Sequence, residues 1–395
     1  MNFIFFSPHF PNNSTDFCFH LKQFGANTLG IGDAEYWTLN GKLKASLTEY
    51  YKVNNMEDYR EVLRAVGYFT YRYGKIDRFD SLNEHWLGIE ADIRTDFNIY
   101  GVKSDFIDNL NRKSRMKEFF KRSGVRTIRA AFCKDIVSAK KFVAEIGYPI
   151  VVKPDIGSGA RLTSKINEEA EFDNFFNNKP ANVNFIAEEY VDGIILTYDG
   201  LIDREGNIRF SASHQFDQSV MDVVNTDDNL FYICLKGMNS EVEACGRKVL
   251  KSFDIKERFF HIEFFKSRKN GEIIALEVNM RPPGAWMTDA INFSYDIDIY
   301  REWANMVLND KVEYACHGKY FTGYASRKDR KKYVHDHEEI LSRYVDGIVK
   351  HGAIEPVFSR AMGNYAYQFR STYVDDVREF IGFVQEEKNS ENRIS

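Results

Sequence analysis

The sequence predicts a protein of mixed α/β and α+β architecture, divided into two or three domains. The chain has 395 residues, which is enough for two or three domains to bury a core each. It opens with a β-α-β pattern, in which apolar strands at residues 2–6 and 27–33 flank a helix at 15–24. Further along, the Phe- and Ile-rich segment 259–266 and the segment 272–281 are separated by a glycine-containing turn, which is typical of an antiparallel hairpin.

The other elements follow from the spacing of apolar residues and from glycines that end helices. Helices are expected where apolar residues recur every three or four positions, at 56–74, 84–96, 104–123, 135–146, 239–253 and 296–309. Strands are expected at 127–133 and 149–153, and they dominate residues 184–216. The tail from residue 311 onward reads as mixed α and β structure.

Composition excludes several classes of protein. The formal net charge is −5, with 53 basic and 58 acidic residues well mixed along the chain, so neither nucleic acid nor an anionic membrane is an expected partner. No apolar run approaches the length of a membrane span. The five cysteines stand singly, without metal-ligand or disulfide spacing, which favours a reduced, cytoplasmic protein.

The hairpin carries the first candidate site. Glu277, Asn279 and Arg281 occupy alternate positions, so in a strand they share one face. A three-residue loop, 269–271 with its glycine in the left-handed conformation, would place Arg268 opposite Glu272. That register predicts that Glu263 lies directly opposite Glu277.

Opposed carboxylates repel each other unless a positive charge lies between them, so the pairing predicts a cation. Glu263, Glu277 and the amide oxygen of Asn279 are hard oxygen donors, which suit Mg²⁺ or Mn²⁺. The alternative is that both glutamates are ordinary solvated positions on the open face of the hairpin, because a neighbouring loop type would shift the register.

A second candidate site follows the strand at 149–153. Lys153 ends this strand, and Gly157, Ser158 and Gly159 form a glycine-containing loop after it. Glycines allow backbone N–H groups to approach phosphate oxygens, and a nearby lysine adds a compact positive charge. By itself such a turn is more often a plain surface loop.

The order of four motifs resembles the ATP-grasp superfamily. These motifs are VVKP followed by the glycine loop, 188-EEYVDG-193, 261-HIEFF-265 and 276-LEVNMRPPG-284. Within that superfamily the chain is most similar to carboxylate-amine ligases. The resemblance implies a Rossmann-like N-terminal domain at 1–105 and a two-subdomain ATP-grasp domain at 106–310 with a hinge near 184–193. It covers the tail only weakly, and the tail is expected to form a small C-terminal α+β region at 311–395.

The resemblance also implies roles for individual residues. Lys113 and Lys153 match the lysines that contact ATP phosphates, and Arg281 matches the arginine that meets the transferred phosphate or the substrate carboxylate. The metal ligands would be Glu263, Glu277 and Asn279. The remaining nucleotide-binding positions are Val151, Gly157, Ser158, Gly159, Glu188, Glu189, Tyr190, Val191 and Phe265. Relatives often place an acidic residue at the position of Ile195 to bind ribose, so Asp199 is the candidate for that contact here.

The implied activity is ATP-dependent ligation, in which a carboxylate is activated as an acyl phosphate and joined to an amine. ATP and Mg²⁺ (or Mn²⁺) would be the cofactors, the partners would be small-molecule carboxylates and amines, and a homodimer is possible. One alternative is a biotin-carboxylase-like enzyme, although no second arginine follows Arg281 closely. Another is an ATP-binding module without catalysis. In the tail, the charged segment 326–339 is interpreted as a solvated face.

Overall fold

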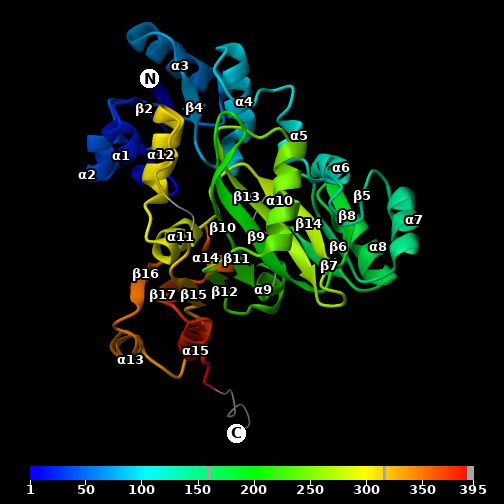
Figure 1. Ribbon diagram of the computed structural model, residues 1–395. Coiled ribbons are helices and arrows are strands. Elements are labelled where there is room, and N and C mark those ends of the chain that lie inside the picture. Colours follow the sequence, from blue (N-terminus) through cyan, green and yellow to red (C-terminus); the bar gives the residue numbers. More distant parts are fainter. Residues whose placement is uncertain (158–161, 219, 315–316, 389–395) are drawn as a thin grey trace.

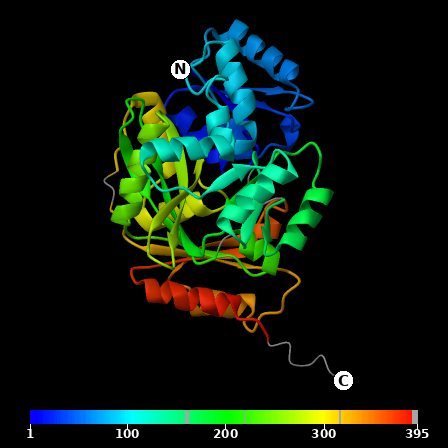
Figure 2. The same ribbon diagram turned by 90° about the vertical axis from the view of Figure 1, so that its right-hand side faces the viewer.

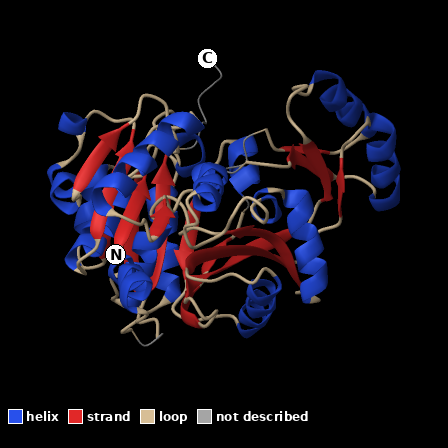
Figure 3. Ribbon diagram, turned by 90° about the horizontal axis from the view of Figure 1, so that it is seen from above, coloured by secondary structure: helices blue, strands red, loops and turns tan. Residues whose placement is uncertain are grey.

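The computed structural model describes residues 1–157, 162–218, 220–314 and 317–388. The described chain forms three β-sheets with helices around them, which confirms the predicted α/β and α+β class (Figure 1). Two of the sheets have four strands and the third has nine. Seen from above, the three groups of strands lie side by side (Figure 3).

The N-terminal part is a parallel sheet in the order β3-β2-β1-β4, as the β-α-β opening predicts. Its strands are β1 (Asn2–Phe6), β2 (Asn27–Gly32), β3 (Glu49–Lys52) and β4 (Arg78–Asp80). Its helices are α1 (Ser14–Gln23), α2 (Gly41–Ser46), α3 (Tyr59–Tyr73) and α4 (Leu87–Asp96), with short 3-10 helices at Tyr36–Thr38 and Glu84–Trp86. The two central strands, β1 and β2, are buried on both faces, so they are mostly apolar in sequence.

The small sheet is antiparallel, in the order β5-β8-β6-β7. Its strands are β5 (Ala130–Phe132), β6 (Ile150–Pro154), β7 (Ser164–Ile166) and β8 (Phe185–Glu189). The helices α7 (Ile136–Ile146) and α8 (Glu169–Asn178) pack on it through Val143 and Phe172. Residues 190–192 alone separate β8 from the first strand of the large sheet, which is where the hinge was expected.

The large sheet follows the order β14-β13-β9-β11-β12-β15-β17-β16, with β10 also paired to β9. Its first strands are β9 (Gly193–Ile202), β10 (Ile208–Ala212), β11 (His214–Phe216), β12 (Phe231–Cys234), β13 (Arg258–Ser267) and β14 (Ile273–Asn279). The tail adds β15 (Phe321–Arg327), β16 (Ile348–Ala353) and β17 (Tyr365–Ser371). Since β12 pairs directly with β15, the sheet continues past residue 310 without a break.

Helices cover this sheet and join it to the N-terminal part. They are α9 (Val220–Thr226), α10 (Ser240–Ser252), α11 (Met287–Tyr295), α12 (Ile299–Asn309), α13 (His337–Arg343), α14 (Ser359–Met362) and α15 (Val374–Gln385). In Figure 2, α15 lies against the face of the C-terminal strands. The ring of Trp303 in α12 packs against Phe3 and Phe17, with centroid distances of 5.7 and 5.1 Å, so α12 shares a core with the N-terminal sheet.

Two helical predictions needed correction. The helix expected at 104–123 is two helices, α5 (Asp108–Asn111) and α6 (Lys113–Ser123). The chain is extended at Arg112, and the backbone N–H of Lys113 donates to Asp155 O at 2.9 Å. The region between β14 and α12 also contains α11, which the apolar spacing did not predict. Within the described ranges, no helix is both long and apolar enough to cross a membrane.

Candidate active site

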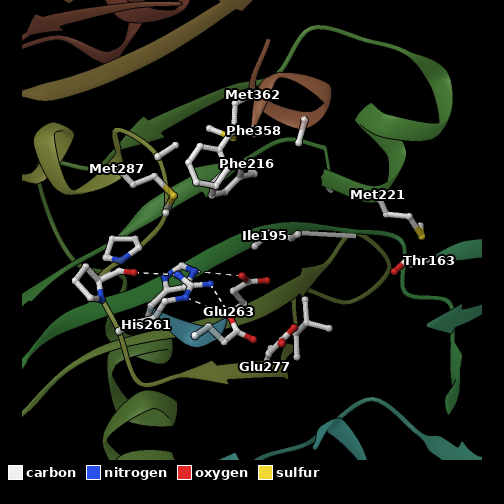
Figure 4. A pocket seen from close by; sticks show the side chains of 18 of the residues that line it. Thr163, Ile195, Phe216, Met221, His261, Glu263, Glu277, Met287, Phe358 and Met362 are labelled. Atoms are coloured by element: carbon white, nitrogen blue, oxygen red, sulfur yellow. Dashed lines mark hydrogen bonds and ion pairs between the residues drawn. The ribbon is translucent and has the colours of Figure 1, made fainter. Parts of the chain in front are cut away.

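A cavity of about 1390 Å³ lies where the N-terminal part, both antiparallel sheets and the tail meet. Its wall includes loop residues after β1, the strand β6, the hinge, the hairpin β13-β14 and the segment around α14. Figure 4 shows its two ends: His261, Glu263 and Glu277 lie at one, and Phe216, Met287, Phe358 and Met362 gather at the other. The cavity therefore has a charged end and an apolar end.

The hairpin places Glu263 directly opposite Glu277, as predicted, although the predicted loop was wrong. Ser267 faces Glu272, because its N–H donates to Glu272 O at 3.0 Å, so the loop is one residue longer than expected. Gly271 has a φ of 73°, the left-handed conformation that was expected. A bulge at Leu276, between the pairs Phe264–Ala275 and Glu263–Glu277, shifts the register back by one residue.

Each of the opposed carboxylates has a positive partner on the protein. Glu277 Oε1 lies 3.0 Å from Lys113 Nζ, and Glu263 Oε1 lies 3.2 Å from His261 Nε2. Burial by itself raises the pKa of Glu277, but Lys113 and then Lys153 outweigh it and lower the pKa. The repulsion that predicted a cation is thus already offset by side chains. Asn279, the third predicted ligand, is buried opposite His261 and does not line the cavity.

A second ionic cluster joins the small sheet to α6. Glu188 is 2% exposed, and its two carboxylate oxygens lie 2.8 Å from Lys117 Nζ and 2.7 Å from Lys153 Nζ. Burial raises the pKa of Glu188, but the two ammonium groups lower it to about 2. Burial lowers the pKa of Lys117, and the positive charge of Lys153 lowers it further. Glu188 raises the pKa of Lys117 but does not outweigh them, because Lys153 shares its carboxylate. Sequence reasoning missed Lys117, which lies one helical turn after Lys113.

The residues expected around adenine line one stretch of the same cavity. Val151 on β6, the hinge residues Glu189, Tyr190 and Val191, and Phe265 on β13 all contribute to its wall. The Tyr190 ring is held by Lys165, whose Nζ lies 3.9 Å from the ring centroid. Gly157 also lines the cavity, and its carbonyl accepts a hydrogen bond of 2.5 Å from Lys113 Nζ. Ser158 and Gly159 lie outside the described residues.

Asp199 cannot be the ribose contact that was expected. Its side chain is fully buried, and its two carboxylate oxygens lie 2.5 Å from His261 Nδ1 and 2.7 Å from His214 Nδ1. The other nitrogen of His214 donates to Met287 O at 3.2 Å. A buried hydrogen-bonded chain thus runs from Glu263 through His261, Asp199 and His214 to the start of α11. The burial of Asp199 could not be predicted from the sequence, because its two histidine partners lie on two other strands, β11 and β13.

The hydrogen-bonded series from Glu263 to Met287 contains two histidines, His261 and His214, whose pKa values are raised. Burial opposes the charge on His261, but the Asp199 carboxylate outweighs it and raises the pKa of His261 to about 9. Burial likewise opposes the charge on His214, but Cys234 and Asp199 raise its pKa to about 10. Both rings donate from both nitrogens in this state, which suits a position between acceptors.

Arg281 lies at the junction of β14 with the N-terminal part, not on the strand as predicted, because β14 ends at Asn279. Its guanidinium donates to Glu84 Oε2 at 2.9 and 3.2 Å, and both residues line the cavity. Glu84 belongs to the short 3-10 helix before α4. The carboxylate of Glu84, which is distant in the sequence, thus pairs with the arginine that was predicted to bind substrate.

The tail supplies part of the wall that sequence reasoning did not find. Lys350 on β16 and Arg360 and Met362 on α14 line the cavity. Lys350 Nζ lies 2.5 Å from Asp289 Oδ2, so the tail brings a basic side chain to the same cavity that Arg281 lines. The segment 326–339 is also not wholly solvated, because Lys328 is buried and pairs with Asp227 at 2.9 Å.

The chain resembles known proteins in sequence and in fold. The ATP-grasp domain family matches residues 146–289. The L-arginine-specific L-amino acid ligase of Bacillus subtilis is 21% identical over 253 residues, covering 62% of this chain and 61% of that protein. The chain spans less than two thirds of the length of the curated relatives it matches.

Two solved structures resemble the whole described chain. The L-amino acid ligase of Bacillus licheniformis has a TM-score of 0.76 at 15% identity, covering 96% of this chain and 95% of that one. The biotin carboxylase domain of Hydrogenobacter thermophilus 2-oxoglutarate carboxylase, crystallised with MgADP and bicarbonate, has a TM-score of 0.68 at 16% identity, covering 93% and 86%. Residues 146–289 thus match an ATP-grasp domain, as the motifs predicted, and the fold of nearly the whole chain resembles that of the L-amino acid ligase.

Proposed function

We propose that the protein is an ATP-dependent ligase that activates a small carboxylate as an acyl phosphate and joins it to an amine. One observation carries the proposal. Glu263, Glu277, Lys113 and Lys153, which come from four different elements, converge on one cavity beside the hinge between two sheets. Such a convergence of titratable groups in a large cleft is typical of a catalytic site.

The residues present fit a divalent cation. Glu263 and Glu277 offer hard oxygen donors at paired positions, and their pairing with the basic groups His261 and Lys113 supports a cation as an alternative partner there. These two glutamates would hold Mg²⁺ or Mn²⁺, and the third ligand, Asn279, remains a prediction. When bound, the ion would neutralise phosphate charge and thereby assist phosphoryl transfer.

The protein's own groups would bind and orient ATP. The backbone of 188–191 would contact adenine, with Val151 and Phe265 beside the ring. Lys113 and Lys153 would exchange their carboxylate partners, Glu277 and Glu188, for phosphate oxygens. Gly157 belongs to the same wall, and we retain Ser158 and Gly159 as predicted phosphate contacts. Asp199 is excluded from the ribose contact by its burial.

Arg281 would release Glu84 and bind the acid substrate or the transferred phosphate. In the first step a carboxylate oxygen attacks the γ-phosphorus, and the bond to ADP breaks. In the second the amine nitrogen attacks the acyl carbon, phosphate leaves, and the surplus amine proton passes to phosphate or solvent. Positioning, charge stabilisation and exclusion of water from the acyl phosphate are the protein's contribution.

An ADP-release screen tests the proposal. The purified protein with MgATP is offered single acids, amines, acid and amine pairs, and bicarbonate, with Glu277→Gln as the inactive control. Release that needs both an acid and an amine, and that the control lacks, supports ligation. Release with bicarbonate alone would indicate a carboxylase-like reaction, and MgATP binding without turnover on any pair would indicate an ATP-binding module.

Two properties stay predictions within this proposal. A cytoplasmic location accords with the described cysteines, all of which are unpaired. A homodimer is testable by sedimentation of the purified protein.

A further inference from the structure

Two positions of β13 share a face at the charged end of the cavity. His261 and Glu263 are two residues apart on this strand, so their side chains leave it on the same side, and both line the cavity. His261 Nε2 lies 3.2 Å from Glu263 Oε1, and Figure 4 shows the two side chains together. This bond engages one oxygen of the Glu263 carboxylate, so the other oxygen can take a second ligand.

The other side of the His261 ring is fixed by Asp199. Asp199 lies directly opposite His261 in the pairing of β9 with β13, and its Oδ1 lies 2.5 Å from His261 Nδ1. Because a carboxylate only accepts hydrogen bonds, the ring donates from Nδ1 to Asp199 and from Nε2 to Glu263. The imidazole is thus held between two carboxylates, and it cannot turn without breaking these bonds.

Asp199 is itself held by further donors. The Thr197 hydroxyl donates to Asp199 Oδ2 at 2.5 Å, and His214 Nδ1 lies 2.7 Å from the same oxygen. His214 donates from Nε2 to Met287 O at 3.2 Å, at the first residue of α11. Thr197, Asp199 and His214 have no exposed surface, so solvent does not compete for these bonds.

Stability alone is a weak reason for this buried hydrogen-bonded series. Buried ion pairs add little to stability compared with apolar residues of the same volume, because desolvation of each charge offsets the attraction. The series begins at α11 and ends at Glu263, one of the two opposed carboxylates of the hairpin. In metal sites, carboxylate ligands are themselves hydrogen-bonded by neighbouring groups that set their orientation. The geometry therefore favours an orienting role.

We propose that His261 and Asp199 are positioning residues, which fix Glu263 in the orientation that binds the divalent cation. This inference rests on the proposed ligase function, in which Glu263 and Glu277 hold that cation. Asp199 and His214 do not line the cavity, so they act only through His261. Through His214, the same series ties the metal ligand to the start of α11.

The perturbation acts on metal affinity. Loss of a group that orients a metal ligand typically weakens metal binding about tenfold to hundredfold. Asp199→Asn keeps the shape of the side chain but has one acceptor oxygen where the aspartate has two. Since His261 and His214 bind different oxygens of Asp199, one of the two histidines loses its acceptor in this variant. Glu263 is unchanged chemically but is less firmly oriented.

The test measures metal binding directly as well as turnover. Binding of Mn²⁺ to the full chain is measured by electron paramagnetic resonance in the presence of a non-hydrolysable ATP analogue. ADP release is measured as a function of Mn²⁺ concentration, on acid and amine pairs. The matched control is Glu302→Gln, which also removes the charge of a buried carboxylate; Glu302 pairs with Arg301 at 2.9 Å and does not line the cavity.

We expect Asp199→Asn to weaken Mn²⁺ binding about tenfold to hundredfold, and to raise the Mn²⁺ concentration for half-maximal turnover by a similar factor. Turnover at saturating Mn²⁺ should stay within a few-fold of the wild type, and Glu302→Gln should change neither property. If Asp199→Asn does not fold, His261→Gln serves instead. It keeps amide donors but loses the ring that joins Glu263 to Asp199, and a loss in the same direction is expected.

Each outcome separates the positioning role from ligation. A variant that binds Mn²⁺ as tightly as the Glu302→Gln control overturns the positioning role and leaves ligation standing. Weaker Mn²⁺ binding in the variant, without turnover of any pair by the wild type, supports the positioning role and overturns ligation. A wild-type protein that binds no Mn²⁺ together with the ATP analogue overturns the metal site and the positioning role with it.

Discussion

The buried Glu188 cluster allows a prediction whose size follows from the geometry. Glu188→Gln keeps the shape of the side chain but removes the charge that serves both Lys117 and Lys153. All three side chains are buried, so solvent screens the loss little. Removing one partner of a buried ion pair costs about 3–5 kcal/mol of unfolding free energy, because an uncompensated charge is left behind. We expect a loss in this range for the protein without nucleotide.

Nucleotide binding should restore part of the unfolding free energy that Glu188→Gln loses. If Lys153 binds phosphate, ATP supplies the negative charge that the variant lacks, so MgATP stabilises Glu188→Gln more than it stabilises the wild type. Urea unfolding with and without Mg²⁺ and a non-hydrolysable ATP analogue measures both quantities. The control is Glu243→Gln, which breaks an exposed pair with Arg247 and should cost less than about 1 kcal/mol. A variant as stable as this control, or one that gains no extra stabilisation from nucleotide, would refute the reasoning.

The same cluster sets an acidic limit on stability. The pKa of Glu188 is lowered in the folded protein to about 2, from a usual value of 4.5. A lowered pKa means that the contribution of Glu188 is fully present above pH 4.5 and is lost as the pH falls towards 2. Urea unfolding of the wild type should therefore show a loss of stability as the pH falls from 4.5 to about 2, and Glu188→Gln should show this loss less strongly.

Three further predictions concern the other charged groups. Asp199→Asn should cost about 3–5 kcal/mol at pH 7 by leaving two buried imidazoliums unpaired, measured by urea unfolding. Since the pKa values of His261 and His214 are raised to about 9 and about 10, their contribution is full below pH 6.5 and is lost as the pH rises through 9 to 10, a loss that the Asn variant should lack. Glu277→Gln should lower ADP release at least ~10²-fold and also destabilise the protein without nucleotide, and a more stable variant would contradict the pairing with a buried lysine. Arg281→Lys should lower acid-dependent ADP release at least ~10²-fold while MgATP affinity stays within a few-fold, and equal losses of both would assign the arginine to the nucleotide.

Local patterns in the sequence were sufficient to predict the main helices and strands before residue 310, but no individual element of the tail. The β-α-β opening, the helix α10 and the hairpin all follow from apolar spacing and glycine positions, which act over a few residues. The break at Arg112 was not predictable in this way, because Lys113 there donates a hydrogen bond to Asp155, which follows α6 by three elements, β5, α7 and β6. Tertiary contacts override local spacing at such points.

The glutamate pair was predicted correctly although one premise was wrong. The loop is one residue longer than the sequence suggested, and the bulge at Leu276 compensates for it. Leu276 O accepts a hydrogen bond from Lys117 Nζ at 3.0 Å, so the bulge also binds the ionic cluster. A bulge next to a functional site redirects the side chains around it, and the local sequence here gave no sign of the bulge.

The apolar end of the cavity could not be predicted from the sequence, for a physical reason. Phe216, Met287 and Met362 meet only because β15 extends the large sheet beyond residue 310 and carries the tail back over the cleft. Each residue alone is indistinguishable from an ordinary core position, since all three also pack against the main core. Only pairing between distant strands shows that they face a cavity.

In the proposed ligase, each lysine at the charged end of the cavity would exchange a carboxylate partner for a phosphate of ATP. Lys113 and Lys153 are both buried, and an unpaired ammonium in such a place would lose its proton or destabilise the fold. Glu277 and Glu188 supply the counter-charges, and their carboxylate oxygens lie 3.0 Å from Lys113 Nζ and 2.7 Å from Lys153 Nζ. Arriving phosphates would then replace one negative partner with another, so the lysines need not be stripped of a counter-charge before they bind. Because the donors are already in place, little reorganisation accompanies binding, which is the condition under which fixed charges stabilise a transition state most strongly.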